Sequence, residues 1–188
     1  MIPTREEALA LLKKYNHDES HIRHARAVEG AMRHFARKRG EDEDLWGIVG
    51  LLHDIDWEET SEDPSRHCHR SKEILEAAGV DALIVRAVQS HGYGICTDVE
   101  PQSEMEKALF TIDELTGLIV TAGLVRPSKS LSDLEVKSVK KKWKDKAFAR
   151  GVDRDLIARG AERWGMPLDV VIEETIAALR PIEKEIGL

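Results

Sequence analysis

Apolar side chains recur at intervals of three and four residues along almost the whole chain, and no segment shows the strict alternation of a half-buried strand. This spacing is typical of amphipathic α-helices, whose apolar stripes are buried against one another. Hydrophobic residues make up 41% of the chain and charged residues 34%, which is enough of each for a buried core and a solvated surface. The sequence therefore predicts an all-α fold.

Capping residues and glycines give the expected helix boundaries. Capping boxes at Thr4–Glu7, Ser103–Glu106 and Ser132–Glu135 mark three helix starts, and several helices stop at a glycine just past an apolar stripe. Two polar loops, 55–64 and 92–102, follow candidate site residues and are expected to carry substrate-binding segments. The helices that we expect span 4–15, 20–39, 43–54, 65–78, 81–91, 103–122, 132–143, 154–164 and 168–184.

The length of 188 residues fits one domain with a smaller appended part. The Gly-, Pro- and Ser-bearing stretch near 123–131 separates the two. We therefore expect a helical core over 1–122 and a C-terminal helical extension over 123–188 that packs on the core. The apolar stripe around Val171 would pack either inward or against a second chain, so a homo-oligomer stays open.

The charge of the chain limits its partners. The net charge of −7 argues against a nucleic-acid or anionic-membrane surface. The segment 137–154 is locally basic, but a solvated helix face explains it more simply than a nucleic-acid interface. The two cysteines form no C-x-x-C pair, and there is neither a signal core nor an apolar run long enough to span a bilayer. These features predict a cytoplasmic protein without membrane contact.

His53 and Asp54 end a nearly continuous apolar run, Trp46 to Leu52. An imidazole and a carboxylate are costly to desolvate together unless a partner uses both. That partner could be a divalent metal ion, or the two side chains could form a hydrogen-bonded core pair without metal.

Four further polar residues fall on the buried stripes of their helices. His24, His67 and His91 align with apolar neighbours, whereas His34 and His69 align with charged ones and should face solvent. His21 lies nearer the start of its helix and should be more exposed to solvent than His24. Each inward histidine has an ordinary structural explanation when taken alone.

Asp113 is the hardest of these residues to explain without a ligand. It lies between Leu109, Thr116 and Val120 on a strongly apolar helix, with no basic residue one turn away. A buried aspartate needs a cation or several donors. Together with His24, His53, Asp54, His67 and His91 it makes a mixed nitrogen and oxygen set, which suits Mn²⁺, Fe²⁺, Co²⁺ or Ni²⁺, with Zn²⁺ and Mg²⁺ as further candidates.

The order His24, His53-Asp54, Asp113 resembles the H…HD…D signature of the HD-domain superfamily of metal-dependent phosphohydrolases, in particular a subgroup of small stand-alone predicted hydrolases. The flanking sequences around the signature match as well, over roughly residues 20–122. The resemblance implies an HD-domain helical bundle and one or two bound ions. In the two-ion members, histidines in the places of His67 and His91 complete the site, and Asp54 would bridge the ions.

The resemblance further implies hydrolysis of a phosphate ester, of a nucleotide or another small phosphorylated metabolite, by metal-activated water. Asp54 would take part in catalysis through the metals, and Asp56 or Glu58 could protonate the leaving oxygen, although both could equally be loop carboxylates. Two other functions stay open: a di-iron oxygenase that uses the same ligands, and a non-catalytic module that senses a nucleotide. The basic residues expected to contact phosphate are Arg66, Arg70 and Lys72.

Overall fold

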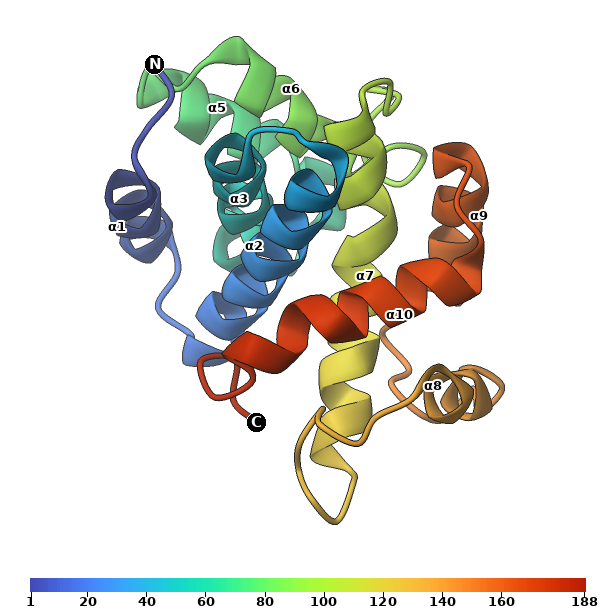
Figure 1. Cartoon of the computed structure of the whole chain (residues 1–188). Helices are drawn as coiled ribbons and strands as arrows, with labels where there is room; N and C mark the ends of the chain where they lie inside the picture. The colour runs from blue at the N-terminus through green and yellow to red at the C-terminus, as the bar shows by residue number, and fades with distance from the viewer.

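The computed structural model describes residues 1–188 and contains helices, two short 3-10 turns and no β-sheet, which confirms the all-α prediction (Figure 1). Each expected helix has a counterpart, with boundaries shifted by a few residues in most, and the helix expected over 65–78 is reduced to 69–77. The elements are α1 (Arg5–Tyr15), α2 (Glu19–Arg39), α3 (Glu43–Leu52), α4 (Trp57–Thr60), η1 (Pro64–Arg66), α5 (His69–Ala77), α6 (Ala82–Ser90), α7 (Glu104–Leu124), α8 (Val136–Trp143), α9 (Arg154–Trp164), α10 (Leu168–Leu179) and η2 (Arg180–Ile182).

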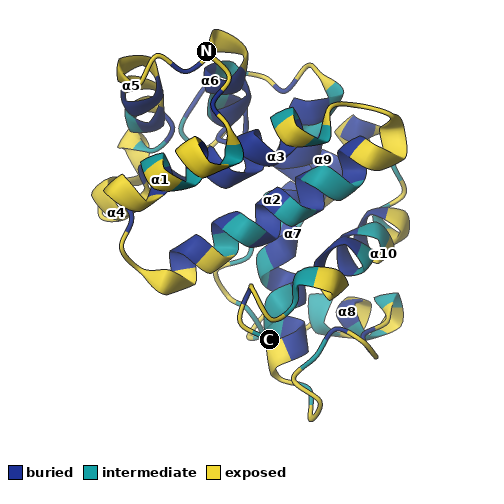
Figure 2. Ribbon diagram, turned by 60° about the vertical axis from the view of Figure 1, so that its left-hand side comes forward, coloured by how far each residue is buried: buried dark blue, intermediate teal, exposed yellow.

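Helices α2, α3 and α7 form the centre of the fold. α2 packs against α3 and α7, α9 packs against α7, and α10 crosses both α2 and α7 (Figure 1). In Figure 2 these central helices carry most of the buried surface, whereas α1, α4 and α8 expose much of theirs. One hydrophobic cluster of 43 buried residues draws side chains from before and after residue 122, so the 123–188 segment shares its core with the rest of the chain.

Glycines allow the central helices to approach closely. A Cβ on Gly50 of α3 would lie 2.9 Å from the carbonyl oxygen of Val28 on α2, and one on Gly160 of α9 would lie 2.9 Å from the Cα of Thr111 on α7. Real Cβ atoms essentially never come this close to backbone, so both helix pairs need a residue without a side chain at these positions.

Two of the three expected capping boxes form. The Thr4–Glu7 and Ser103–Glu106 boxes are complete, with each side chain bound to the other residue's backbone. The third does not form, because α8 begins only at Val136. Its N-cap residue is Glu135, whose side chain makes no capping hydrogen bond. The Ser132 N–H donates instead to the Ser130 hydroxyl, a local bond that competes with a helix start.

The helix expected over 65–78 is broken. Cys68 has φ 65°, in the left-handed region that non-glycine residues rarely adopt, and it separates η1 from α5. His67 therefore lies in the break and not within a helix. The helix expected over 43–54 likewise ends at Leu52, and the short α4 forms inside the loop expected over 55–64.

Helix α10 faces inward, which settles where its apolar stripe packs: Val171, Ile172 and Ile176 are all buried in the core. Glu174 on the same helix accepts hydrogen bonds from His34 at 2.7 Å and Lys38 at 2.6 Å, both on α2. The prediction that His34 is a solvated surface histidine was wrong, because Glu174 covers it.

The basic segment 137–154 stays at the surface, where Lys137 pairs with Glu135 and Lys140 with Asp169. No helix of the fold has the combined length and apolar character that a membrane crossing requires.

Candidate metal centre

The six residues predicted as metal ligands converge at one end of the helical core. His24 comes from the second turn of α2, His53 caps the end of α3, and Asp54 follows it. The other three are His67 from the break before α5, His91 at the end of α6, and Asp113 from α7.

Asp54 lies at the middle of the cluster, and its two carboxylate oxygens face different partners. Its Oδ1 is 3.3 Å from Nε2 of His67 and 3.3 Å from Nε2 of His91. Its Oδ2 is 3.4 Å from Nε2 of His53 and 4.0 Å from Nε2 of His24. The cluster therefore divides into two groups of donors that share one carboxylate.

Sub-site A comprises His24, His53 and Asp113 together with Oδ2 of Asp54. The Oδ1 atom of Asp113 is 3.0 Å from Nε2 of His24 and 3.3 Å from Nε2 of His53. The ligand atoms of these three residues all lie within 4.8 Å of one another, so they can hold one ion.

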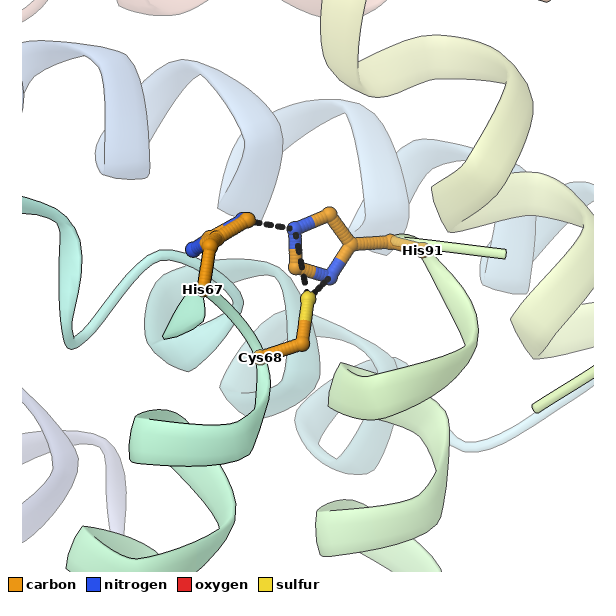
Figure 3. Close-up of side chains that lie close together, drawn as sticks. All are labelled: His67, Cys68 and His91. Carbon is orange, nitrogen blue, oxygen red and sulfur yellow. Dashed lines mark hydrogen bonds between the residues drawn. The ribbon is translucent and has the colours of Figure 1, made fainter. Parts of the chain in front are cut away.

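Sub-site B comprises His67 and His91 together with Oδ1 of Asp54, with the sulfur of Cys68 beside them. Figure 3 shows the two imidazoles pointing toward each other from separate chain segments, with Nε2 to Nε2 at 3.0 Å. The Cys68 sulfur lies against the His91 ring, 3.7 Å from Nδ1 and 3.8 Å from Nε2 (Figure 3). His67, Cys68 and His91 also form a group that could hold a metal ion.

The hydrogen bonds on the far sides of the two rings of sub-site B place the single hydrogen of a neutral ring on Nδ1. His67 Nδ1 donates to the carboxylate of Asp56 at 2.8 Å, and His91 Nδ1 donates to the carbonyl of Val88. Since each acceptor lacks a hydrogen of its own, a neutral ring has its lone pair on Nε2. Two lone pairs facing each other at 3.0 Å repel unless a cation or a proton lies between them.

His53 shows the same arrangement in sub-site A. Its Nδ1 donates to the Gly50 carbonyl at 2.7 Å, and its fully buried Nε2 has no hydrogen-bond partner. An unpartnered buried nitrogen between two carboxylates is what a metal ligand looks like before its ion is added. Burial lowers the pKa of His53, but the charges of Asp54 and Asp113 outweigh it and hold that pKa well above its ordinary value.

The two carboxylates remain ionised in this environment. Burial raises the pKa of Asp113, but the charge of His53 and the hydrogen bond from His24 outweigh it and hold the pKa well below its usual range. The same opposition, with His53 as the main partner, keeps the pKa of Asp54 low. Two buried anions with four imidazoles around them are a donor set that fits a divalent transition metal.

A cavity of about 490 Å³ opens onto the cluster. Its volume is in the usual range for small-molecule sites, about 300–1,000 Å³. No lysine or arginine lines it, so any positive charge offered to a ligand would come from bound ions. The lining residues are His21, His24, Asp54, Trp57, Pro64, His67, His91, Gly92, Ile95, Cys96, Asp113, Glu114, Gly117, Gly151, Val152 and Leu156.

Several of these residues were missed by the sequence reasoning. Glu114 is the one carboxyl group of the lining outside the proposed ligands, and burial together with the charge of Asp113 raises its pKa to about 7. The only sequence feature that pointed to Glu114 was its position directly after Asp113. Gly151, Val152 and Leu156 come from the C-terminal segment and carry no sequence signal of a site.

The sequence indicated only that Cys68 and Cys96 form no C-x-x-C pair, and both are free thiols in the structure. The hydrogen bond with Cys68 lowers the pKa of the Cys96 thiol to about 6.

The two carboxylates proposed as proton donors are engaged elsewhere. Asp56 is fully buried, where it accepts from His67 and from the Ser71 N–H at 2.9 Å. Glu58 accepts from the backbone N–H groups of His17 and Asp18, both at 2.6 Å. These placements suit orientation of His67 and capping of α2, and neither carboxylate lines the cavity beside the cluster.

The three basic residues proposed as phosphate contacts also lie outside the cavity. Arg70 pairs with Glu59 at 2.7 Å, Lys72 lies 3.8 Å from Glu76, and Arg66 is exposed. They follow the solvent-facing side of α5 and the turn before it.

His21 is the buried neighbour and His24 the partly exposed one, the reverse of the expectation. His21 is 8% exposed, and its ring nitrogen lies 3.1 Å from the backbone carbonyl of Asp54. It therefore braces the turn that carries Asp54 and places no ring nitrogen among the ligands. His69 is exposed, as expected, with Nε2 2.9 Å from the Cys96 carbonyl.

No protein-family model matches the chain, and a search of solved structures finds no significant match. The helical fold and its buried histidine and aspartate cluster could hold a metal ion and are compatible with an HD domain.

Proposed function

We propose that the protein is a metal-dependent phosphohydrolase of the HD-domain type, with a binuclear centre and a small phosphorylated substrate such as a nucleotide. The observation that supports this most is the arrangement of Asp54, whose two oxygens face two separate groups of imidazoles. A shared carboxylate with nitrogen donors on both sides is the arrangement expected of a two-ion hydrolytic site.

The six ligands would hold the ions, His24, His53 and Asp113 on one side and His67 and His91 on the other, with Asp54 between them. Bound divalent ions supply positive charge for phosphoryl oxygens and lower the pKa of a coordinated water.

The chain's own residues orient these ligands. The Gly50 carbonyl fixes the ring of His53, the Asp56 carboxylate fixes that of His67, and the Val88 carbonyl fixes that of His91. Each bond directs Nε2 toward the centre and keeps the ring in one tautomer. Glu114 replaces Asp56 and Glu58 as the candidate proton donor to the leaving oxygen, because it lines the cavity beside Asp113 and is not a ligand.

The lining without basic side chains has a consequence for substrate choice. A phosphate dianion would be held by the metal charge alone, so affinity should depend strongly on metal loading. The charged part of the substrate should lie at the ions, and its remainder against Trp57, Ile95 and Val152.

The test is hydrolysis of a panel of nucleotides and sugar phosphates by protein loaded with Mn²⁺, Co²⁺ or Ni²⁺. Asp54→Asn should reduce turnover by more than about 100-fold, since even the partners that orient metal ligands are worth ~10–100-fold. His17→Ala, which removes an exposed histidine outside the centre, should leave turnover unchanged. Absence of hydrolysis with every metal, in folded and metal-loaded protein, would refute the proposal.

A di-iron oxygenase is the second candidate, and the lining favours it in one respect. A cavity without lysine or arginine would accept an uncharged substrate as readily as an anion. Iron as the dominant metal of the purified protein, with iron-dependent oxygen consumption, would support this candidate over hydrolysis.

A further inference from the structure

Two free thiols meet beside the metal cavity, and one of them, Cys96, lines it. Both sulfur atoms lie within 2.7 Å of the point where a Cβ on Gly92 would sit, Cys96 at 2.5 Å and Cys68 at 2.7 Å. Gly92 therefore leaves the space that the two sulfur atoms share, and their separation cannot exceed the sum of these two distances. The side chains come from segments 28 residues apart in sequence, as the numbers 68 and 96 give.

The two thiols differ in access. Cys68 is fully buried, whereas Cys96 is partly exposed and lines the cavity. A small oxidant that enters the cavity would therefore meet Cys96 first, with Cys68 directly behind it. Cys96 also belongs to the short turn 92–97, whose neighbour Ile95 is exposed.

The backbone at Cys68 is held in an unusual conformation. Its φ of 65° is one that a residue with a side chain rarely adopts, and it directs the sulfur into the space beside Gly92 and against the His91 ring (Figure 3). A strained residue of this kind in the wall of a site is a reason to ask what the side chain does there.

We propose that Cys68 and Cys96 are an oxidisable dithiol that a peroxide converts to a disulfide in the wall of the metal cavity. The Cys96 sulfur attacks one oxygen of hydrogen peroxide and the O–O bond breaks, which gives a sulfenic acid and one water. The Cys68 sulfur then attacks the Cys96 sulfur, the S–O bond breaks, and a second water leaves. Two thiols are oxidised by two electrons, and the peroxide is reduced to two waters.

The disulfide would alter sub-site B. Cys68 is joined to His67 by a peptide bond, and its sulfur packs against His91. Drawing that sulfur toward Cys96 moves the neighbours of both histidines, so the oxidised protein should bind one metal ion fewer. This consequence depends on the proposed metal function, whereas the disulfide itself does not.

The experiment treats the metal-free full chain with hydrogen peroxide, alkylates the remaining thiols and maps the peptides by mass spectrometry. The wild type should lose both thiols and yield one Cys68–Cys96 linked peptide within a monomer, reversed by dithiothreitol. In Cys68→Ser, Cys96 should stop at a sulfenic acid that dimedone traps; in Cys96→Ser, Cys68 should stay reduced. Circular dichroism checks that both variants fold.

The proposal is overturned if Cys96 proceeds to the sulfinic acid in the wild type without a link to Cys68, if the only disulfides join two chains, or if neither thiol reacts before free glutathione does. Elemental analysis of the reduced and oxidised forms then separates the two ideas. A linked peptide in a protein that binds no metal in either form refutes the metal centre and leaves the dithiol standing.

Discussion

Gly50→Ala is the sharpest test of how the fold positions the centre. The added Cβ would lie 2.9 Å from the Val28 carbonyl oxygen and 3.0 Å from the Glu29 Cα, whereas ordinary contact begins at 3.4 Å. Both are backbone atoms of α2, so the two helices must move apart by several tenths of an ångström. Overpacking of this kind costs about 1–3 kcal/mol, and the better helix propensity of alanine returns about 1 kcal/mol.

The net expectation is a destabilisation of about 1 kcal/mol, which corresponds to a fall in unfolding temperature of about 2–4 °C for a chain of this size. The matched control is Gly117→Ala on α7, where an added Cβ meets nothing within 4 Å. That change should stabilise the protein by up to about 1 kcal/mol through helix propensity alone.

The assay is thermal unfolding of both variants, followed by circular dichroism in the presence of EDTA so that metal binding does not contribute. The close approach of α2 and α3 would be refuted if both variants raised the unfolding temperature alike. A second readout is metal affinity, which should fall in Gly50→Ala because His53 and Asp54 follow within one helical turn.

Three further outcomes are expected. Asp56→Ala should weaken one of two metal-binding steps by about 10–100-fold, because it removes the acceptor that orients His67; a calorimetric titration with Mn²⁺ that matches the wild type would contradict this role. Adding metal at about 100 times its Kd should stabilise the protein by about 2.7 kcal/mol for each ion bound, relative to an EDTA-treated sample, and equal melting of the two samples would count against any ion site. Burial raises the pKa of Glu174, but hydrogen bonds from Lys38 and His34 outweigh this effect and lower the pKa overall. The stability that ionised Glu174 contributes is therefore present above the unfolded-state pKa of about 4.3 and is lost as the pH falls below that value. Glu174→Gln should therefore cost about 0.5–1 kcal/mol at neutral pH and progressively less below about pH 4, measured by urea unfolding; an equal cost at every pH would contradict the ion-pair explanation.

Helical periodicity predicted most of this fold because nearly every helix buries one face, and a face can be read from spacing alone. The same reasoning placed His24, His91 and Asp113 on inward stripes, and they do meet. It failed at Cys68, where the backbone has a positive φ and no glycine or proline marks the break in the helix.

The roles of Asp56 and Glu58 could not be predicted, because nearness to His53-Asp54 in the sequence does not determine which way a side chain points. The turn after α3 buries Asp56 beneath His67 and sends Glu58 toward the start of α2. Arg70 and Lys72 were proposed for their charge, but their helix turns both toward solvent. The wall from Gly151 to Leu156 depends on how α9 docks on α7, which no local pattern describes.

The proposed metal ligands all precede residue 114, yet part of the cavity above them is lined by residues of the segment 151–156. Under the proposed function, the residues that carry the chemistry and part of those that select the substrate would therefore lie in separate stretches of the chain. Replacing Val152 or Leu156 could admit differently shaped molecules without disturbing a single coordinating atom. A lineage could in this way retain one chemistry while exchanging the compounds it accepts.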